Sequence, residues 1–79
     1  GELLFKLGRL LAASGERIRA TTLLSQAAEL DETNIPVRLE LARTFLSMKK
    51  PILAEKPLVQ ILEVDRGHEE ARALLEECS

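Results

Sequence analysis

Apolar residues recur at spacings of three and four along most of the chain, which is the period of an amphipathic helix. The first such stripe is formed by Leu4, Leu7 and Leu11. It predicts a helix over about residues 2–13, which Gly15 ends. A second stripe predicts a helix over about residues 16–30. Its apolar positions are Ala20, Leu23, Leu24, Ala27 and Leu30.

Three further helices are predicted in the rest of the chain. Asn34 is a favourable N-cap and Pro36 is tolerated in a first turn, so a helix is expected from there to about Lys49. The fourth helix is expected to open at a proline and close at a glycine, over residues 51–67, and the fifth covers residues 69–78. The apolar positions of these helices are Val37, Leu41, Ala42, Phe45, Met48, Ala54, Leu58, Ile61, Leu62, Ala71, Leu74, Leu75 and Cys78. No stretch alternates with period two long enough to predict a strand, so the fold class is all-α.

The fourth predicted helix contains a second proline, Pro57. Proline in a helix interior removes a hydrogen bond and clashes with the preceding turn, at a cost of about 3 kcal/mol or more. Either the helix kinks at Pro57, or the turn that follows Pro51 is a loop and the helix begins at Pro57. Because the apolar face continues from Ala54 to Leu62 across the proline, we favour the kink.

A shift of 34 residues aligns the chain with itself. The offset pairs Leu7 with Leu41, Arg9 with Arg43, Ile18 with Ile52, Ala20 with Ala54, Leu24 with Leu58, Gln26 with Gln60, Glu29 with Glu63 and Asp31 with Asp65. It also pairs Gly8 with Ala42 and Leu11 with Phe45, so small residues face small ones and large residues face large ones. The repeating unit is therefore a helix-turn-helix pair.

This unit resembles the tetratricopeptide repeat, whose signature includes a small residue at the eighth place, an alanine at the twentieth and a closing turn near the thirty-second. The positions that fit are Leu4, Leu7, Gly8, Leu11, Ala20, Leu24 and Ala27, then Leu41, Ala42, Phe45, Ala54 and Leu58. The resemblance implies antiparallel helix-turn-helix repeats stacked as a short right-handed α-solenoid. It divides a single domain, residues 1–79, into repeats 1–34 and 35–68 and a capping or third-repeat helix at 69–79.

Small residues have a specific place in this pattern. A glycine inside a helix costs about 1 kcal/mol relative to alanine. We expect Gly8 and Ala20 to lie where the two helices of a repeat cross, with Ala42 and Ala54 equivalent in the next repeat, since small side chains let the backbones approach. The alternative is that Gly8 lowers helix stability without compensation.

Two departures from the family pattern concern the turns and one core position. The usual closing proline is replaced by Glu32 and Arg66, which makes the turns between repeats less rigid. The small residue at Ala27 becomes Ile61 in the second repeat.

Composition limits the functions that fit. The chain has 79 residues, 46% hydrophobic and 30% charged, as in a folded, soluble domain. Its net charge of −2, with both signs interspersed, provides no basic face for nucleic acid and no polybasic patch for a membrane surface. The longest uncharged run, residues 20–28, is too short for membrane insertion. No targeting segment is visible, so the cytoplasm is the default compartment, and the start at Gly1 without methionine suggests an excised fragment.

Nothing in the sequence predicts catalysis. His68 is the only histidine and stands at a helix junction, where an exposed or capping role is expected. Cys78 is the only cysteine, and on the apolar side of the last helix it is expected to be a small buried hydrophobe without an activating base. No metal-binding cluster and no glycine-rich phosphate loop occur. We therefore predict that the chain is not an enzyme and takes no cofactor.

On the resemblance, one side of the first and third helices lines a concave groove that holds a peptide or partner helix. The predicted contact residues are Phe5, Lys6, Arg9, Leu39, Glu40, Arg43 and Leu46. Arg9 and Arg43 stand one repeat apart and suit a partner with acidic groups. The alternative is that both are ordinary solvated charges, partly neutralised by Glu2 and Glu40.

Members of the family that clamp the C-terminal carboxylate of chaperone tails use lysine and asparagine at defined groove positions. Here those positions resemble Phe5, Arg9, Glu40, Glu70 and Leu74, so the clamp is missing.

The predicted function is a protein-interaction module. A structural or self-association role is the alternative, because two repeats fall short of the three or so that usually stabilise such an array. Leu3 and Leu10 point to where an earlier repeat would pack, and a homodimer, an upstream repeat or a partner would cover them.

Overall fold

The computed structural model describes residues 2–31 and 34–78, apart from the side chains of Glu2 and Leu4. Its helices are α1 (Glu2–Ala13), α2 (Arg17–Leu30), α3 (Ile35–Ser47), α4 (Pro51–Val64) and α5 (Glu69–Cys78). No strand occurs in these residues, and the all-α prediction is confirmed. Two predictions fall outside the described part of the chain. They are the turn at Glu32 and the place of the Leu4 side chain in the apolar stripe of the first helix.

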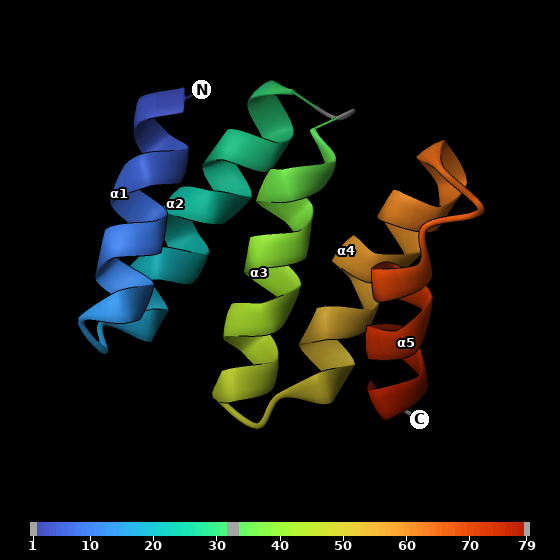
Figure 1. Ribbon diagram of the computed structural model, residues 1–79. Coiled ribbons are helices and arrows are strands. Elements are labelled where there is room, and N and C mark those ends of the chain that lie inside the picture. The colour runs from blue at the N-terminus through green and yellow to red at the C-terminus, as the bar shows by residue number, and fades with distance from the viewer. Residues whose placement is uncertain (1, 32–33, 79) are drawn as a thin grey trace.

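Consecutive helices run antiparallel and follow one another across the molecule in chain order (Figure 1). The principal contacts join α1 to α2, α2 to α3, α3 to α4 and α4 to α5, and α1 makes a smaller contact with α3. The molecule measures 28 × 26 × 15 Å, so it is flat. With α1 and α5 at opposite ends of the row, this is an open stack of helix pairs rather than a closed bundle (Figure 1).

The core consists of two clusters on either side of α3. The first cluster contains Leu24, Ala27, Ala28, Val37 and Leu41. The second contains Ala42, Ala54, Leu58, Ile61 and Ala71. Phe45 packs against both clusters, so α3 links the two halves of the molecule.

Burial follows the 34-residue repeat. The pairs without exposed surface are Ala20 with Ala54 and Leu24 with Leu58. Ile18 and Ile52 are both exposed. Leu7 departs from this rule: it is 41% exposed although it belongs to the predicted apolar stripe of the first helix, whereas the equivalent Leu41 is 7% exposed. The physical reason is that α3 packs between α2 and α4, while α1 has α2 as its main neighbour.

Gly8 is buried at the crossing of α1 and α2, as predicted. A Cβ atom at this position would lie 2.7 Å from Cγ of Leu24 and 3.6 Å from the carbonyl oxygen of Ala20. Leu24 is fully buried and has little room to move away. The close packing of α1 against α2 therefore compensates for the helix stability lost at Gly8. The alternative, that Gly8 lowers helix stability without compensation, is wrong.

The C-termini of α1 and α3 have the same hydrogen-bonded end. After α1, Gly15 has φ 91°, and the N–H of Glu16 donates to the carbonyl of Leu11 at 2.8 Å. After α3, Lys49 has φ 59°, and the N–H of Lys50 donates to the carbonyl of Phe45 at 3.0 Å. This pattern, with one left-handed residue, is a Schellman motif.

Two predicted helix ends were too long. The third helix was expected to reach about Lys49, but it ends at Ser47 because Lys49 is left-handed. The fourth was expected to close at Gly67, but it ends at Val64. There the backbone of Asp65 is extended, and its carboxylate accepts the N–H of Gly67 at 3.1 Å in a tight turn.

The N-cap predicted at Asn34 is confirmed, and of the two roles expected for His68, exposed or capping, the structure shows capping. The side-chain oxygen of Asn34 accepts the N–H of Val37 at 3.3 Å at the start of α3. Nδ1 of His68 accepts the N–H of Ala71 at 3.0 Å at the start of α5, so the histidine has a capping role.

Helix α4 begins at Pro51 and continues through Pro57. The alternative that the helix begins at Pro57 is therefore wrong, whereas the kink stays a prediction. Because Pro57 has no N–H, the carbonyl of Leu53 lacks its usual donor four residues later.

Leu3 and Leu10 are exposed on α1, as expected, and the homodimer that would cover them stays a prediction. Across residues 2–31 and 34–78, no helix has the length and apolar character needed to cross a membrane.

Candidate functional site

A hollow of about 320 Å³ lies between α1 and α3. Its lining residues are Arg9, Ala12, Ala13, Glu40, Arg43, Thr44 and Ser47. We call it the α1–α3 hollow. Three of the predicted contact residues, Arg9, Glu40 and Arg43, thus line one depression although they come from different repeats.

The predicted apolar contact residues are half-buried and contribute to the core. Phe5 packs against the first cluster. Leu39 and Leu46 pack against the second, because α3 has helices on both sides. Lys6 is exposed and does not line the hollow. The structure therefore brings together Arg9, Glu40 and Arg43 at one depression, whereas the apolar contact residues lie against two different core clusters.

The two arginines of the hollow differ in their surroundings. The guanidinium of Arg9 lies 5.6 Å from the centre of the Phe5 ring, within cation–π range. Arg43 forms an ion pair with Glu70 of α5. Its partner in this ion pair is thus not Glu40, which lines the same hollow. The role expected of Glu2 concerns a side chain outside the described part of the chain.

Glu70 also belongs to this surface. From the sequence it was considered as a groove position that lacks the residue type of the carboxylate clamp. A signal was available, because the 34-residue shift places Glu70 at the position of Pro36, on the predicted groove side of the third helix. Its pair with Arg43 extends the surface from α3 to α5.

The hydroxyl groups of the hollow bond within their own helix. Thr44 donates to the carbonyl of Glu40 at 2.8 Å, and Ser47 donates to the carbonyl of Thr44 at 2.7 Å. The hollow's main groups for contact with a carboxylate are therefore its guanidinium groups, which can bind carboxylates in a bidentate way.

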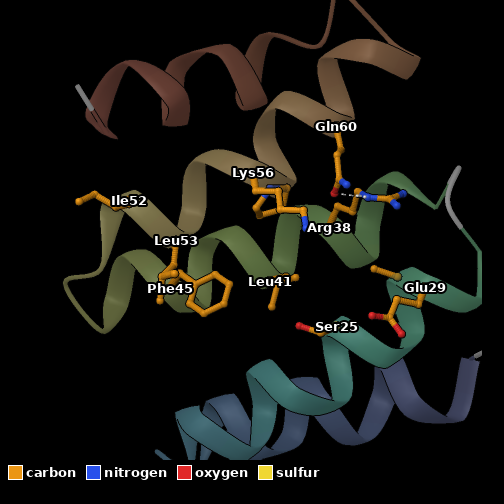
Figure 2. Close-up of a pocket in the computed structure, with 11 residues that line it drawn as sticks. Ser25, Glu29, Arg38, Leu41, Phe45, Ile52, Leu53, Lys56 and Gln60 are labelled. Atoms are coloured by element: carbon orange, nitrogen blue, oxygen red, sulfur yellow. Dashed lines mark hydrogen bonds between the residues drawn. The ribbon is translucent and has the colours of Figure 1, made fainter.

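A second and larger depression, of about 460 Å³, lies between α2, α3 and α4 (Figure 2). We call it the α2–α4 pocket. It includes Arg38, a buried side chain whose Nε donates to Oε1 of Gln60 at 3.1 Å. This site was not predicted from the sequence, because an arginine between apolar positions of a helix has the pattern of a solvated residue.

The groups considered for catalysis have other roles. Burial raises the pKa of the Cys78 thiol, and the charges of Glu55 and Glu77 raise it further. This thiol donates to the carbonyl of Leu74 at 3.4 Å, while the ring of His68 caps α5. No cluster of three or more metal-ligating side chains occurs in the part of the chain that the structure describes.

Comparison with models of known protein families gives a match. The sequence profile of the tetratricopeptide repeat matches residues 11–78, which is most of the chain. No curated protein matches the sequence.

Proposed function

Because this chain belongs to the tetratricopeptide repeat family, we propose that it is a protein-interaction scaffold that holds a peptide or a partner helix across α1, α3 and α5. The observation that carries the proposal is the α1–α3 hollow, in which Arg9 and Arg43 line one depression. Stacked helix pairs commonly use such a shared face for binding.

The charges of this face change sign from one end to the other. At α1, Arg9 makes no ion pair with any carboxylate whose side chain the structure describes. At α5, Glu70 holds Arg43, and the 34-residue shift places Glu77 at the position of Arg9 and Arg43. A partner with acidic groups over α1 and basic groups over α5 would match this arrangement.

The two arginines are not equivalent in the proposal. At Arg9 a partner carboxylate has no described carboxylate to displace, whereas it must compete with Glu70 for Arg43. We expect Arg9→Glu to weaken binding more than Arg43→Glu.

The experiment is a selection of peptides from a random display library on the immobilised chain, followed by chemical-shift mapping of the enriched sequences. The enriched peptides should be acidic and should shift the amide signals of Arg9, Ala13 and Arg43. The double variant Arg9→Glu and Arg43→Glu should lose binding while its helical circular dichroism is retained.

The matched control is the double variant Arg17→Glu and Arg72→Glu. It makes the same change of charge at exposed positions outside the hollow, so binding should persist. Enriched peptides that bind equally to the hollow variant and to the control would refute the proposal.

A further inference from the structure

The α2–α4 pocket shares no lining residue with the α1–α3 hollow and is a separate site. Figure 2 shows Ile52, Leu53 and Phe45 toward one end of the pocket, and Arg38, Gln60 and Glu29 toward the other. The pocket therefore has an apolar end and a polar end.

Arg38 is the unusual residue of the polar end. It is 5% exposed, and its hydrogen-bond partner, Gln60, is an uncharged amide. Among the described residues, no carboxylate forms an ion pair with it. A buried cation without an opposite charge is destabilising, so a carboxylate that entered the pocket would gain a strong partner.

The outer nitrogens of this guanidinium are accessible. No side-chain nitrogen or oxygen in the described part of the chain is both enclosed and without a hydrogen-bond partner. Because only Nε of Arg38 has a hydrogen-bond partner among the described residues, its Nη groups retain contact with solvent. Lys56 adds a second, exposed cation to the lining, against the single acidic residue Glu29.

The apolar end provides both surface and a backbone acceptor. Ile52 is 80% exposed, which is a large apolar area for a residue at the edge of a cavity. Leu53 and Pro57 both line the pocket, and the carbonyl of Leu53 lacks the helical N–H that proline cannot supply. A peptide has backbone N–H groups that can donate to this carbonyl, whereas a free organic acid does not.

We propose that the α2–α4 pocket binds an extended segment of a protein partner that has a large apolar side chain and, a few residues away, a carboxylate. The apolar side chain covers Phe45, Leu53 and Ile52, and the carboxylate binds Arg38 and Lys56. This is a second interaction surface, independent of the one formed by α1, α3 and α5.

The probe is a panel of capped alanine-based hexapeptides, each with one phenylalanine and one aspartate at varied spacing and in either order. At least one should shift the amide signals of Ser25, Phe45 and Gln60 in the isotope-labelled chain. The same peptide with asparagine in place of aspartate should have an affinity at least about fivefold lower, because it lacks the charge.

Variants at the pocket have opposite expected effects. Lys56→Gln should weaken binding of the aspartate peptide, and Glu29→Gln should strengthen it, since the second change removes the competing carboxylate. Both residues are exposed, so neither change should unfold the chain, which is the risk at Arg38. Arg66→Gln is the matched control, because Arg66 is exposed in the turn after α4 and does not line the pocket.

Pro57→Ala tests the backbone acceptor. It gives the helix an N–H for the carbonyl of Leu53, so binding should weaken while helicity is kept. If this variant bound the peptide as tightly as the unmodified chain, the carbonyl of Leu53 would not be part of the site. The reason to prefer a peptide over a free organic acid would then be lost.

Other outcomes would overturn the proposal as a whole. They are the absence of shifts with every aspartate peptide at millimolar concentration, or equal affinity of aspartate and asparagine peptides. If 4-phenylbutanoate bound as tightly as the best peptide, the pocket would be a site for free organic acids instead. The double variant Arg9→Glu and Arg43→Glu should bind these peptides normally, which separates failure here from failure of the proposed function.

Discussion

Lys49 adopts the left-handed conformation that Gly15 adopts 34 residues earlier, and both close a helix with the same two-bond pattern. The N–H of Gly15 donates to the carbonyl of Ala12, and the N–H of Lys49 donates to the carbonyl of Leu46. The turn geometry therefore repeats although the glycine does not. A residue with a Cβ pays roughly 1 kcal/mol for this conformation.

Replacement of Lys49 by glycine should therefore stabilise the chain by about 0.5–1 kcal/mol, because glycine has no Cβ to clash in the left-handed region. Gly15→Ala should have the opposite effect. Urea unfolding followed by circular dichroism measures both. Lys50→Gly is the control, since Lys50 has φ −122° and gains nothing from glycine. A less stable Lys49→Gly variant would contradict this account.

Substitution of Gly8 by alanine should destabilise the chain even though alanine favours helices. The new Cβ would lie 2.7 Å from Cγ of Leu24, and overpacking costs about 1–3 kcal/mol, against about 1 kcal/mol gained in helix propensity. Thermal unfolding gives the net change.

A double-mutant cycle identifies the clash with Leu24 as the cause. In the Leu24→Ala background, Gly8→Ala should become neutral or stabilising, because the obstructing atoms are gone. Gly67→Ala is the control, since the nearest atom to its Cβ would be 3.7 Å away. Equal effects of Gly8→Ala in both backgrounds would exclude the clash.

Loss of the His68 cap should destabilise α5. His68→Ala leaves the N–H of Ala71 without its acceptor, at a cost of about 1 kcal/mol, whereas His68→Asn should preserve most of the stability. Hydrogen exchange of the Ala71 amide and thermal unfolding measure the effect. Unchanged protection of this amide in His68→Ala would show that the cap does not contribute.

The Cys78 thiol should react slowly with iodoacetamide. Its pKa is raised first by burial and then by the charges of Glu55 and Glu77, so less thiolate is present at a given pH below the pKa than in an unstructured cysteine peptide. Unfolding in denaturant should give the largest increase in rate. Glu55→Gln and Glu77→Gln should give smaller increases at neutral pH that vanish once the thiol is fully ionised.

Glu63→Gln is the control for the thiol, because Glu63 lies on α4 and is not among the charges that shift this pKa. A folded chain that reacts as fast as the peptide across the neutral to alkaline range would disagree with the prediction.

Local signals in the sequence were enough to predict most of the fold. The spacing of apolar residues located all five helices, and Asn34 marked the N-cap of α3. Gly8 and Ala20 predicted the helix crossing, because only a close approach explains glycine inside a helix. These features depend on residues within a few turns of each other.

The remaining features depend on packing between helices. The ion pair of Arg43 with Glu70 and the hydrogen bond of Arg38 with Gln60 join residues far apart in the chain. The left-handed Lys49 was also missed, because lysine has no preference for that conformation. For the same reason the prediction for Arg9 and Arg43 was only partly right. Both arginines line the hollow, but Arg43 already forms an ion pair with Glu70.

The flat row of helices also affects how the molecule would respond to a mechanical load. Since the principal contacts join helices that are consecutive in the chain, the described parts of α1 and α5 make no substantial contact with each other. A pull on the termini should therefore detach one end first and extend the molecule in steps, while the pairs around α3 remain folded. Such a domain would behave as an extensible link between whatever is joined to its two ends.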